Sequence, residues 1–118
     1  MKVHGLGLKG ELAARRFLRK KGWRILERNF QCRWGELDLI AQDKDCLVFC
    51  EVKTRSAGMI AAPQESVTYT KQQKMIKTAL YWLQSKEMDR PMRFDVIAVT
   101  VDAKGHLAVE HLENAFTL

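Results

Sequence analysis

Residues 35–55 decide the fold, and they read GELDLIAQDKDCLVFCEVKTR. Two stretches rich in apolar residues, 37–41 and 47–50, flank the polar residues 42–45. Apolar runs on either side of a short polar turn are typical of a buried β-hairpin. The sequence therefore predicts two antiparallel strands here, joined by a tight turn.

The turn also sets the register of this hairpin. With its tip at residues 44–45, Asp38 faces Glu51, and two residues further from the turn Glu36 faces Lys53. Because side chains alternate along a strand, all four are predicted to project from one face, although a shift of one residue would break the arrangement. Like charges directly opposite each other destabilise a sheet, so the facing carboxylates predict a bound cation. Magnesium and manganese favour such oxygen ligands.

Length and composition predict one soluble domain. The chain has 118 residues, of which 47% are hydrophobic and 29% are charged, enough for one core and too few for two. Its net charge of +6 favours a polyanionic partner, with nucleic acid ahead of the alternative that the protein is merely basic.

Cysteine usage and hydropathy bear on the compartment. Cys32, Cys46 and Cys50 show no CxxC spacing, and the last two lie among apolar residues, as buried free thiols do. The sequence has no long apolar run typical of a signal peptide or a membrane span. We therefore expect a cytoplasmic protein with no membrane partner.

Hydrophobic spacing predicts two helices, over residues 6–21 and 67–86. In the first, Gly22 follows three cations and is suited to end the helix. The second has an apolar stripe at helical spacing, made of Ile76, Ala79, Leu80 and Leu83.

Three more strands are predicted, over residues 23–30, 94–101 and 106–111. Short connections favour an antiparallel meander for the first three strands of the chain. Residues 56–66 have the composition of a loop suited to substrate contacts, and residues 113–118 that of a tail. The order α-β-β-β-α-β-β predicts a single α/β domain over residues 1–118, with a mixed central sheet flanked by helices.

The chemistry is concentrated in the pattern D-x12-E-x-K, formed by Asp38, Glu51 and Lys53. Two carboxylates can hold one or two magnesium ions, which polarise a phosphodiester and lower the pKa of bound water. A lysine two residues along the same strand face can orient that water and stabilise developing negative charge. This pattern predicts metal-dependent phosphodiester hydrolysis.

The pattern resembles the active site of the PD-(D/E)xK nuclease superfamily. More closely, the chain resembles the YraN-like family of uncharacterised bacterial proteins, relatives of archaeal Holliday junction resolvases. Trp34 departs from that family, which often has a second glycine there. The matching pieces run in one order along nearly the whole chain: Gly10-Glu11, Gly35-Glu36-Leu37-Asp38-Leu39-Ile40, Phe49-Cys50-Glu51-Val52-Lys53, Ser66-Val67-Thr68, Lys71-Gln72 with Lys74, Arg93-Phe94-Asp95-Val96, and Glu113-Asn114-Ala115-Phe116.

The resemblance implies a restriction-endonuclease-like fold and assigns roles to individual residues. Asp38 and Glu51 are implied to bind Mg²⁺ or Mn²⁺, and Lys53 to be the catalytic lysine. Glu11 is implied to complete the acidic cluster; without the resemblance it reads as a solvated helix carboxylate paired with Arg15.

A basic stripe on the second helix predicts contacts with nucleic acid. It contains Lys71, Lys74 and Lys77, and Gln72 matches the family's glutamine behind the site. The alternative is a polar face that keeps the protein soluble.

Aromatic and histidine residues give weaker signals. Trp34 and Tyr69 are candidates to stack on bases, whereas Trp23 and Trp82 are expected in the core. The three histidines (His4, His106 and His111) show no ligand spacing and are expected to be surface or strand residues.

Together these features predict a Mg/Mn-dependent DNA endonuclease acting on branched or single-stranded DNA. The alternative is a non-catalytic DNA-binding or scaffold protein that keeps the nuclease fold. Junction-cutting relatives act in pairs, which implies a homodimer. The exposed candidates for its interface are Trp34, Met59 and Ile60.

Overall fold

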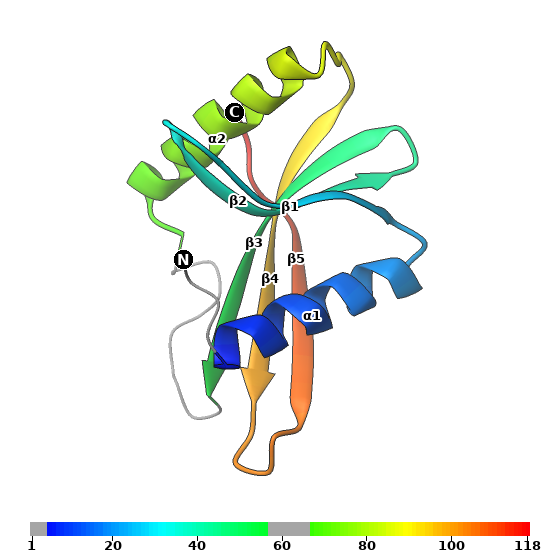
Figure 1. Cartoon of the computed structure of the whole chain (residues 1–118), viewed down its shortest axis with the longest axis vertical. Coiled ribbons are helices and arrows are strands. Elements are labelled where there is room, and N and C mark those ends of the chain that lie inside the picture. Colours follow the sequence, from blue (N-terminus) through cyan, green and yellow to red (C-terminus); the bar gives the residue numbers. More distant parts are fainter. Residues whose placement is uncertain (1–4, 57–66) are drawn as a thin grey trace.

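The computed structural model describes residues 5–56 and 67–118. Within these ranges lie two helices and five strands (Figure 1). In chain order they are α1 (Gly5–Lys20), β1 (Arg24–Cys32), β2 (Gly35–Asp43), β3 (Cys46–Ser56), α2 (Tyr69–Ser85), β4 (Met92–Val101) and β5 (Leu107–Phe116). The predicted order α-β-β-β-α-β-β is confirmed.

The five strands form one sheet in the order β1-β2-β3-β4-β5. β1, β2 and β3 are an antiparallel meander, β3 pairs with β4 in parallel, and β4 pairs with β5 in antiparallel fashion. A parallel pair needs a crossover connection, and α2 lies in the connection between β3 and β4. The predicted mixed sheet is therefore confirmed.

The predicted register of the β2–β3 hairpin is also confirmed. Its ladder runs from the pair Asp43–Cys46 at the turn to the pair Leu39–Cys50. Lys44 at the tip has a positive φ of 57°, as a tight turn between paired strands requires. Beyond Leu39, β2 remains paired with β1 while β3 continues along β4.

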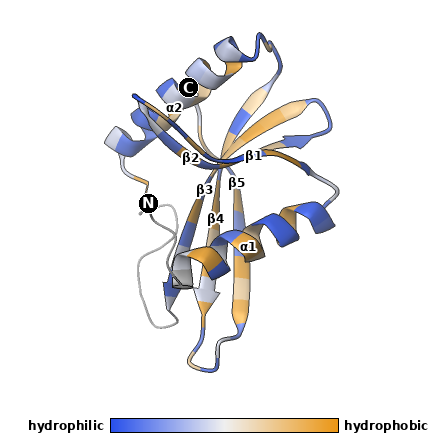
Figure 2. Cartoon of the chain, viewed as in Figure 1, coloured by the Kyte–Doolittle hydropathy of each residue, from blue (hydrophilic) through white to orange (hydrophobic). Residues whose placement is uncertain are grey.

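Each face of the sheet has its own hydrophobic cluster. Phe49 of β3 packs in the cluster that includes Met75, Ala79 and Trp82 of α2. Its neighbour Val48 packs in the cluster that includes residues of α1. Alternate side chains of β3 thus reach opposite faces, which is why its first half, Cys46–Cys50, is apolar without interruption. Figure 2 shows hydrophobic residues along the strands and hydrophilic residues along much of α2.

Several predicted boundaries were wrong. The expected tail at residues 113–118 is mostly strand, because β5 continues to Phe116. β1 extends two residues beyond its predicted end, to Cys32. Of the predicted loop at 56–66, Ser56 belongs to β3 and the remainder lies outside the described residues. Neither of the two described helices has the length and apolar character needed to cross a membrane.

Helix α1 lies very close to the sheet at Gly10. A Cβ atom added there would lie 1.7 Å from the Thr54 Oγ1 atom of β3 and 2.8 Å from its Cβ. Since contacts this short do not occur between real side chains, the absence of a side chain at Gly10 sets the distance between α1 and β3.

We expect Gly10→Ala to lower the free energy of unfolding by about 1–3 kcal/mol, the usual cost of overpacking. Urea denaturation of the variant and the wild type measures this difference. Thr54→Ala removes the closest overlapping atom, so the double variant should recover part of the loss relative to Gly10→Ala alone. A double variant that is no more stable than Gly10→Ala would show that Thr54 is not the obstacle.

Candidate functional site

The site is centred on the carboxylate of Glu51, which is buried between β3 and α2. Lys71 of α2 donates a short hydrogen bond to Glu51 Oε2. Lys53 Nζ lies 3.3 Å from the same oxygen. Two ammonium groups from different elements therefore share one buried carboxylate oxygen.

The start of α2 explains how Lys71 reaches this position. Thr68 is the N-cap residue, and its hydroxyl oxygen accepts a hydrogen bond from the Lys71 backbone N–H at 3.2 Å. The Gln72 amide donates to the Val67 carbonyl at 3.0 Å. These two local bonds fix the first turn of the helix beside β3.

The pKa values of the two lysines are shifted in opposite directions. Burial and the neighbouring Lys71 lower the pKa of Lys53. Burial also acts to lower the pKa of Lys71, but its hydrogen bond to Glu51 and the charge of that carboxylate outweigh burial and raise the pKa. Lys71 is thus the main counter-charge of Glu51, and Lys53 is the lysine that loses its proton more readily.

Asp38 lies next to this group. Asp38 and Glu51 are the next residues in the hairpin register beyond the last ladder pair, Leu39–Cys50. The Asp38 carboxylate is buried, and its Oδ2 atom accepts a hydrogen bond from the Val52 backbone N–H at 2.8 Å. The Asp38 carboxylate therefore lies against β3 at Val52, the residue that follows Glu51 in the chain.

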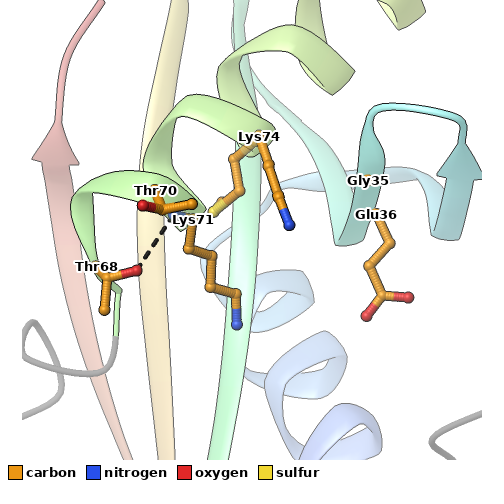
Figure 3. Close-up of a pocket in the computed structure, with 7 residues that line it drawn as sticks. Gly35, Glu36, Thr68, Thr70, Lys71 and Lys74 are labelled. Atoms are coloured by element: carbon orange, nitrogen blue, oxygen red, sulfur yellow. Dashed lines mark hydrogen bonds between the residues drawn. The ribbon is translucent and has the colours of Figure 1, made fainter.

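A pocket of about 400 Å³ opens beside these residues. Figure 3 shows Lys71 and Lys74 extending from α2 and Glu36 reaching in from β2. Glu36 also accepts a hydrogen bond from the Gln31 amide of β1 at 3.1 Å, and the β2–β3 ladder ends at Leu39, before Glu36. The pocket thus presents two lysine side chains and a carboxylate beside Glu51.

Gly35 brings the β1–β2 turn close to α2. Its φ of 151° favours glycine, and a Cβ atom there would lie 3.2 Å from Thr78 Oγ1. The adjacent Trp34 is 38% exposed, and Lys77 Nζ lies 5.4 Å from its ring centroid. The turn therefore forms one wall of the site region.

Glu11 is buried on α1, and its Oε1 atom accepts a hydrogen bond from the Asn29 amide at 3.2 Å. Within residues 5–56 and 67–118, no three His, Cys, Asp or Glu side chains are grouped as ligands for a metal ion. The implied role of Glu11 in an acidic cluster stays a prediction, and the alternative of a solvated helix carboxylate is wrong because Glu11 is buried.

The residues predicted to bind nucleic acid lie along one helix but differ in their surroundings. Lys74 is exposed at the pocket and Lys71 contacts Glu51. Lys77 lies over Trp34, and Gln72 bonds the backbone. Among the aromatic residues, Trp23 and Trp82 are buried as predicted, whereas Tyr69 is exposed. Met59 and Ile60 lie outside the described residues.

The sequence interpretation missed one further buried carboxylate, Asp95 of β4. It accepts two hydrogen bonds from Arg93, at 3.0 and 3.1 Å, and one from the Asn114 backbone N–H at 2.9 Å. His111 Nε2 lies 2.7 Å from it. Burial acts to raise the pKa of Asp95, but the bonds to His111 and Arg93 outweigh it and lower the pKa.

His111 is a strand residue, as expected, but its side chain is buried rather than on the surface. Its ring packs edge-on against Phe17 and Trp23, with centroids 5.9 and 5.3 Å apart. The spacing Arg-x-Asp, which puts Arg93 and Asp95 on one face of a strand, was the available signal for this network. His106 is exposed beside Asp102, and His4 lies outside the described residues.

Comparison with known proteins places the chain in a family. The model of the uncharacterised protein family UPF0102 matches residues 10–99. The chain belongs to this family. A UPF0102 protein of Geobacter metallireducens is 45% identical over 121 aligned positions, covering 100% of this chain and 98% of the relative. UPF0102 proteins of Thermodesulfovibrio yellowstonii and Pelotomaculum thermopropionicum are 47% and 49% identical and cover 94% of this chain. The predicted YraN-like membership is confirmed.

The lowered pKa of Asp95 predicts how the stability of this UPF0102 protein depends on pH. Because its folded pKa is lowered, the ionised carboxylate stabilises the fold above its unfolded pKa of about 3.9, and this contribution disappears as pH falls through the folded pKa. We expect Asp95→Asn to cost about 3–5 kcal/mol at pH 7, as breaking a buried charged network does. Chemical denaturation should show this difference shrinking below about pH 4.

Asp89→Asn is the matched control, because Asp89 is exposed between α2 and β4. It should change stability little at any pH. A difference between wild type and Asp95→Asn that stays constant from pH 7 to pH 3 would contradict the ionised network.

Proposed function

We propose that this protein is a metal-dependent nuclease of the PD-(D/E)xK type that hydrolyses phosphodiester bonds in DNA. The observation that carries the proposal is the buried Glu51 carboxylate, with Lys53 beside it and Asp38 next in the hairpin register. The net charge of +6 supports a polyanionic substrate. Branched and single-stranded forms are the proposed substrates.

The donor set fits Mg²⁺ or Mn²⁺. Asp38 and Glu51 offer carboxylate oxygens from adjoining strands, and magnesium is usually bound through one or two carboxylates together with substrate phosphates and water. When bound, such a metal polarises the phosphodiester and lowers the pKa of a coordinated water. The contact of Lys71 with Glu51 shows that this carboxylate already attracts a cation.

Two lysines of the chain are proposed to bind the phosphates of the substrate. Lys53 is held at Glu51 on a strand inside the sheet, so it can offer a positioned ammonium group to a phosphate at the site. Burial and the neighbouring Lys71 lower the pKa of Lys53, so it gives up a proton more readily than an exposed lysine. Lys74, exposed at the pocket, can bind a neighbouring phosphate.

A second candidate function has its own supporting observation. Lys71 and Lys53 together balance the charges of Asp38 and Glu51, so the site is electrically neutral without a metal. Such a site is compatible with a DNA-binding or scaffold protein that keeps the nuclease fold. Homodimerisation and a cytoplasmic location stay predictions under either function.

Lys53→Ala separates the two functions. We expect it to lower the rate of DNA cleavage by about 100-fold or more, the usual effect of losing a group that stabilises transition-state charge. DNA affinity should change little, since 20 residues of the chain are Lys or Arg. The assay uses linear, single-stranded, flapped and four-way DNA, with and without manganese.

Lys104→Ala, in the turn after β4, removes an exposed lysine and should cut DNA like the wild type. Equal cleavage by the wild type and Lys53→Ala would refute the catalytic role of this lysine. Tight binding of every substrate without cleavage would favour the DNA-binding function.

Lys71 is expected to compete with the metal for Glu51. Replacing it by methionine removes the ammonium group from Glu51 Oε2 and should tighten Mn²⁺ binding by at least about 10-fold, since 1.4 kcal/mol of relieved repulsion is a factor of ten. Isothermal titration calorimetry measures the affinity. Lys74→Met, which removes a pocket lysine with no role in this contact, is the control and should change affinity less. Unchanged affinity in Lys71→Met would show that the two cations do not compete.

A further inference from the structure

Beyond the Glu51 site, α2 presents a continuous polar and aromatic stripe. Lys71, Lys74, Lys77 and Tyr81 recur every three or four residues and so lie on one side of the helix. The first two line the pocket beside Glu51, and the third lies over Trp34. The stripe therefore leads from the candidate catalytic site past the β1–β2 turn.

A second pocket lies at the far end of this stripe. It has a volume of about 430 Å³ and is lined by Phe30, Gln31, Cys32, Arg33 and Tyr81. The Tyr81 ring is stacked on Phe30 with a centroid distance of 6.4 Å and an interplanar angle of 28°. Tyr81 is nevertheless 46% exposed, so it also offers aromatic surface to a ligand.

Cations surround the aromatic groups on the side of this pocket that leads to Glu51. The Arg33 guanidinium carbon lies 4.6 Å from the centroid of the Trp34 ring, and Lys77 Nζ lies 5.4 Å from it. Trp34 therefore holds two positive charges between the two pockets. Aromatic surface next to a row of cations is the combination by which proteins bind single-stranded nucleic acid, with stacked bases and neutralised phosphates.

We propose that the pocket at Tyr81 takes an unpaired base of a DNA strand whose phosphates follow α2 toward Glu51. The inference rests on the proposed function and narrows its substrate to DNA with unpaired bases near the cut. A fully paired strand keeps its bases stacked inside the duplex and offers none to Tyr81. Charge complementarity favours this occupant, because Arg33, Lys74 and Lys77 border the path that the strand would follow.

The length of the stripe sets the expected spacing. Ten residues separate Lys71 from Tyr81, which is about 15 Å along a helix that rises 1.5 Å per residue. Stacked DNA rises about 3.4 Å per nucleotide along one strand, so the stacked base lies roughly four nucleotides from the phosphate at Glu51. The substrate therefore needs an unpaired segment of at least that length.

The test compares two probes that carry the same phosphates. One is a single-stranded thymidine oligonucleotide, and the other is an abasic deoxyribose-phosphate chain of equal length. Binding is measured by fluorescence anisotropy in EDTA, so that neither metal nor cleavage contributes. If bases stack on Tyr81, the wild type should bind the thymidine probe on the order of 10-fold more tightly than the abasic probe.

The variants show whether Tyr81 is responsible for that preference. Tyr81→Leu should lose most of it by weakening only the thymidine probe, and Tyr81→Phe should retain it. Leu107→Ala changes an exposed apolar residue at the start of β5, which lines neither pocket, and should behave like the wild type. All variants should keep the salt dependence of the wild type on the abasic probe, since no phosphate contact is removed.

Two results would overturn the inference. One is equal affinity of the wild type for both probes, or no binding of the thymidine probe. The other is a Tyr81→Leu variant that keeps the full preference or weakens both probes equally. The proposed nuclease function is tested separately. A protein that shows the Tyr81-dependent preference but cuts no DNA would support the base site and refute the nuclease function. A protein that cuts DNA without this preference would support the nuclease function and refute the base site.

Discussion

The structure depends on how one buried charge is compensated. Glu51 lies in a strand that is covered on both faces, where an unpaired carboxylate would be strongly destabilising. Lys53 comes from the same strand, but Lys71 comes from α2 and reaches Glu51 only if the helix begins where Thr68 caps it. The ion pair therefore ties the crossover helix to the strand that it follows. The contact between Lys71 and Glu51 joins α2 to β3, which pairs in parallel with β4. Lys71 also lines the pocket, so the same contact places the pocket beside Glu51.

The fold was predictable wherever local pattern and tertiary packing favour the same structure. Residues 42–45 fixed the tip of the hairpin, and the apolar residues on both sides fixed its register because both faces of β3 are buried. The end of β5 was not predictable in this way. Asn114 has a positive φ of 54°, and the pairing of β4 with β5 shifts between Phe94 and Val96, so this stretch lacks the alternation of a regular strand. A bond from the Asn114 N–H to Asp95 holds it, and nothing local in the sequence indicates that bond.

In the site, too, contacts set by local geometry were predictable and contacts set by tertiary packing were not. Glu51 and Lys53 are two residues apart on one strand, so strand geometry alone places them together. Lys71 was predicted to contact phosphates, and the structure shows it on Glu51, a contact between residues 20 positions apart that needs the whole crossover. For Gln72 the observed contact is the carbonyl of Val67 at the start of α2, which a helix-capping pattern does not reveal. The sequence therefore predicted which residues gather at the site better than the contacts they make there.

Two of the buried carboxylates of the sheet, Glu51 and Asp95, are compensated in opposite ways, and this contrast bears on function. Asp95 is fully buried and is held by an arginine, a histidine and a backbone N–H, groups with fixed geometry that leave little room for another ligand. Glu51 is held by two lysines on flexible side chains, and the Lys71 side chain is 37% exposed at a pocket. A lysine can leave a carboxylate by rotating its side chain when another cation takes its place, whereas the Asp95 network cannot open without moving β5. Asp95 is thus suited to holding the sheet together, and Glu51 to exchanging one cation for another.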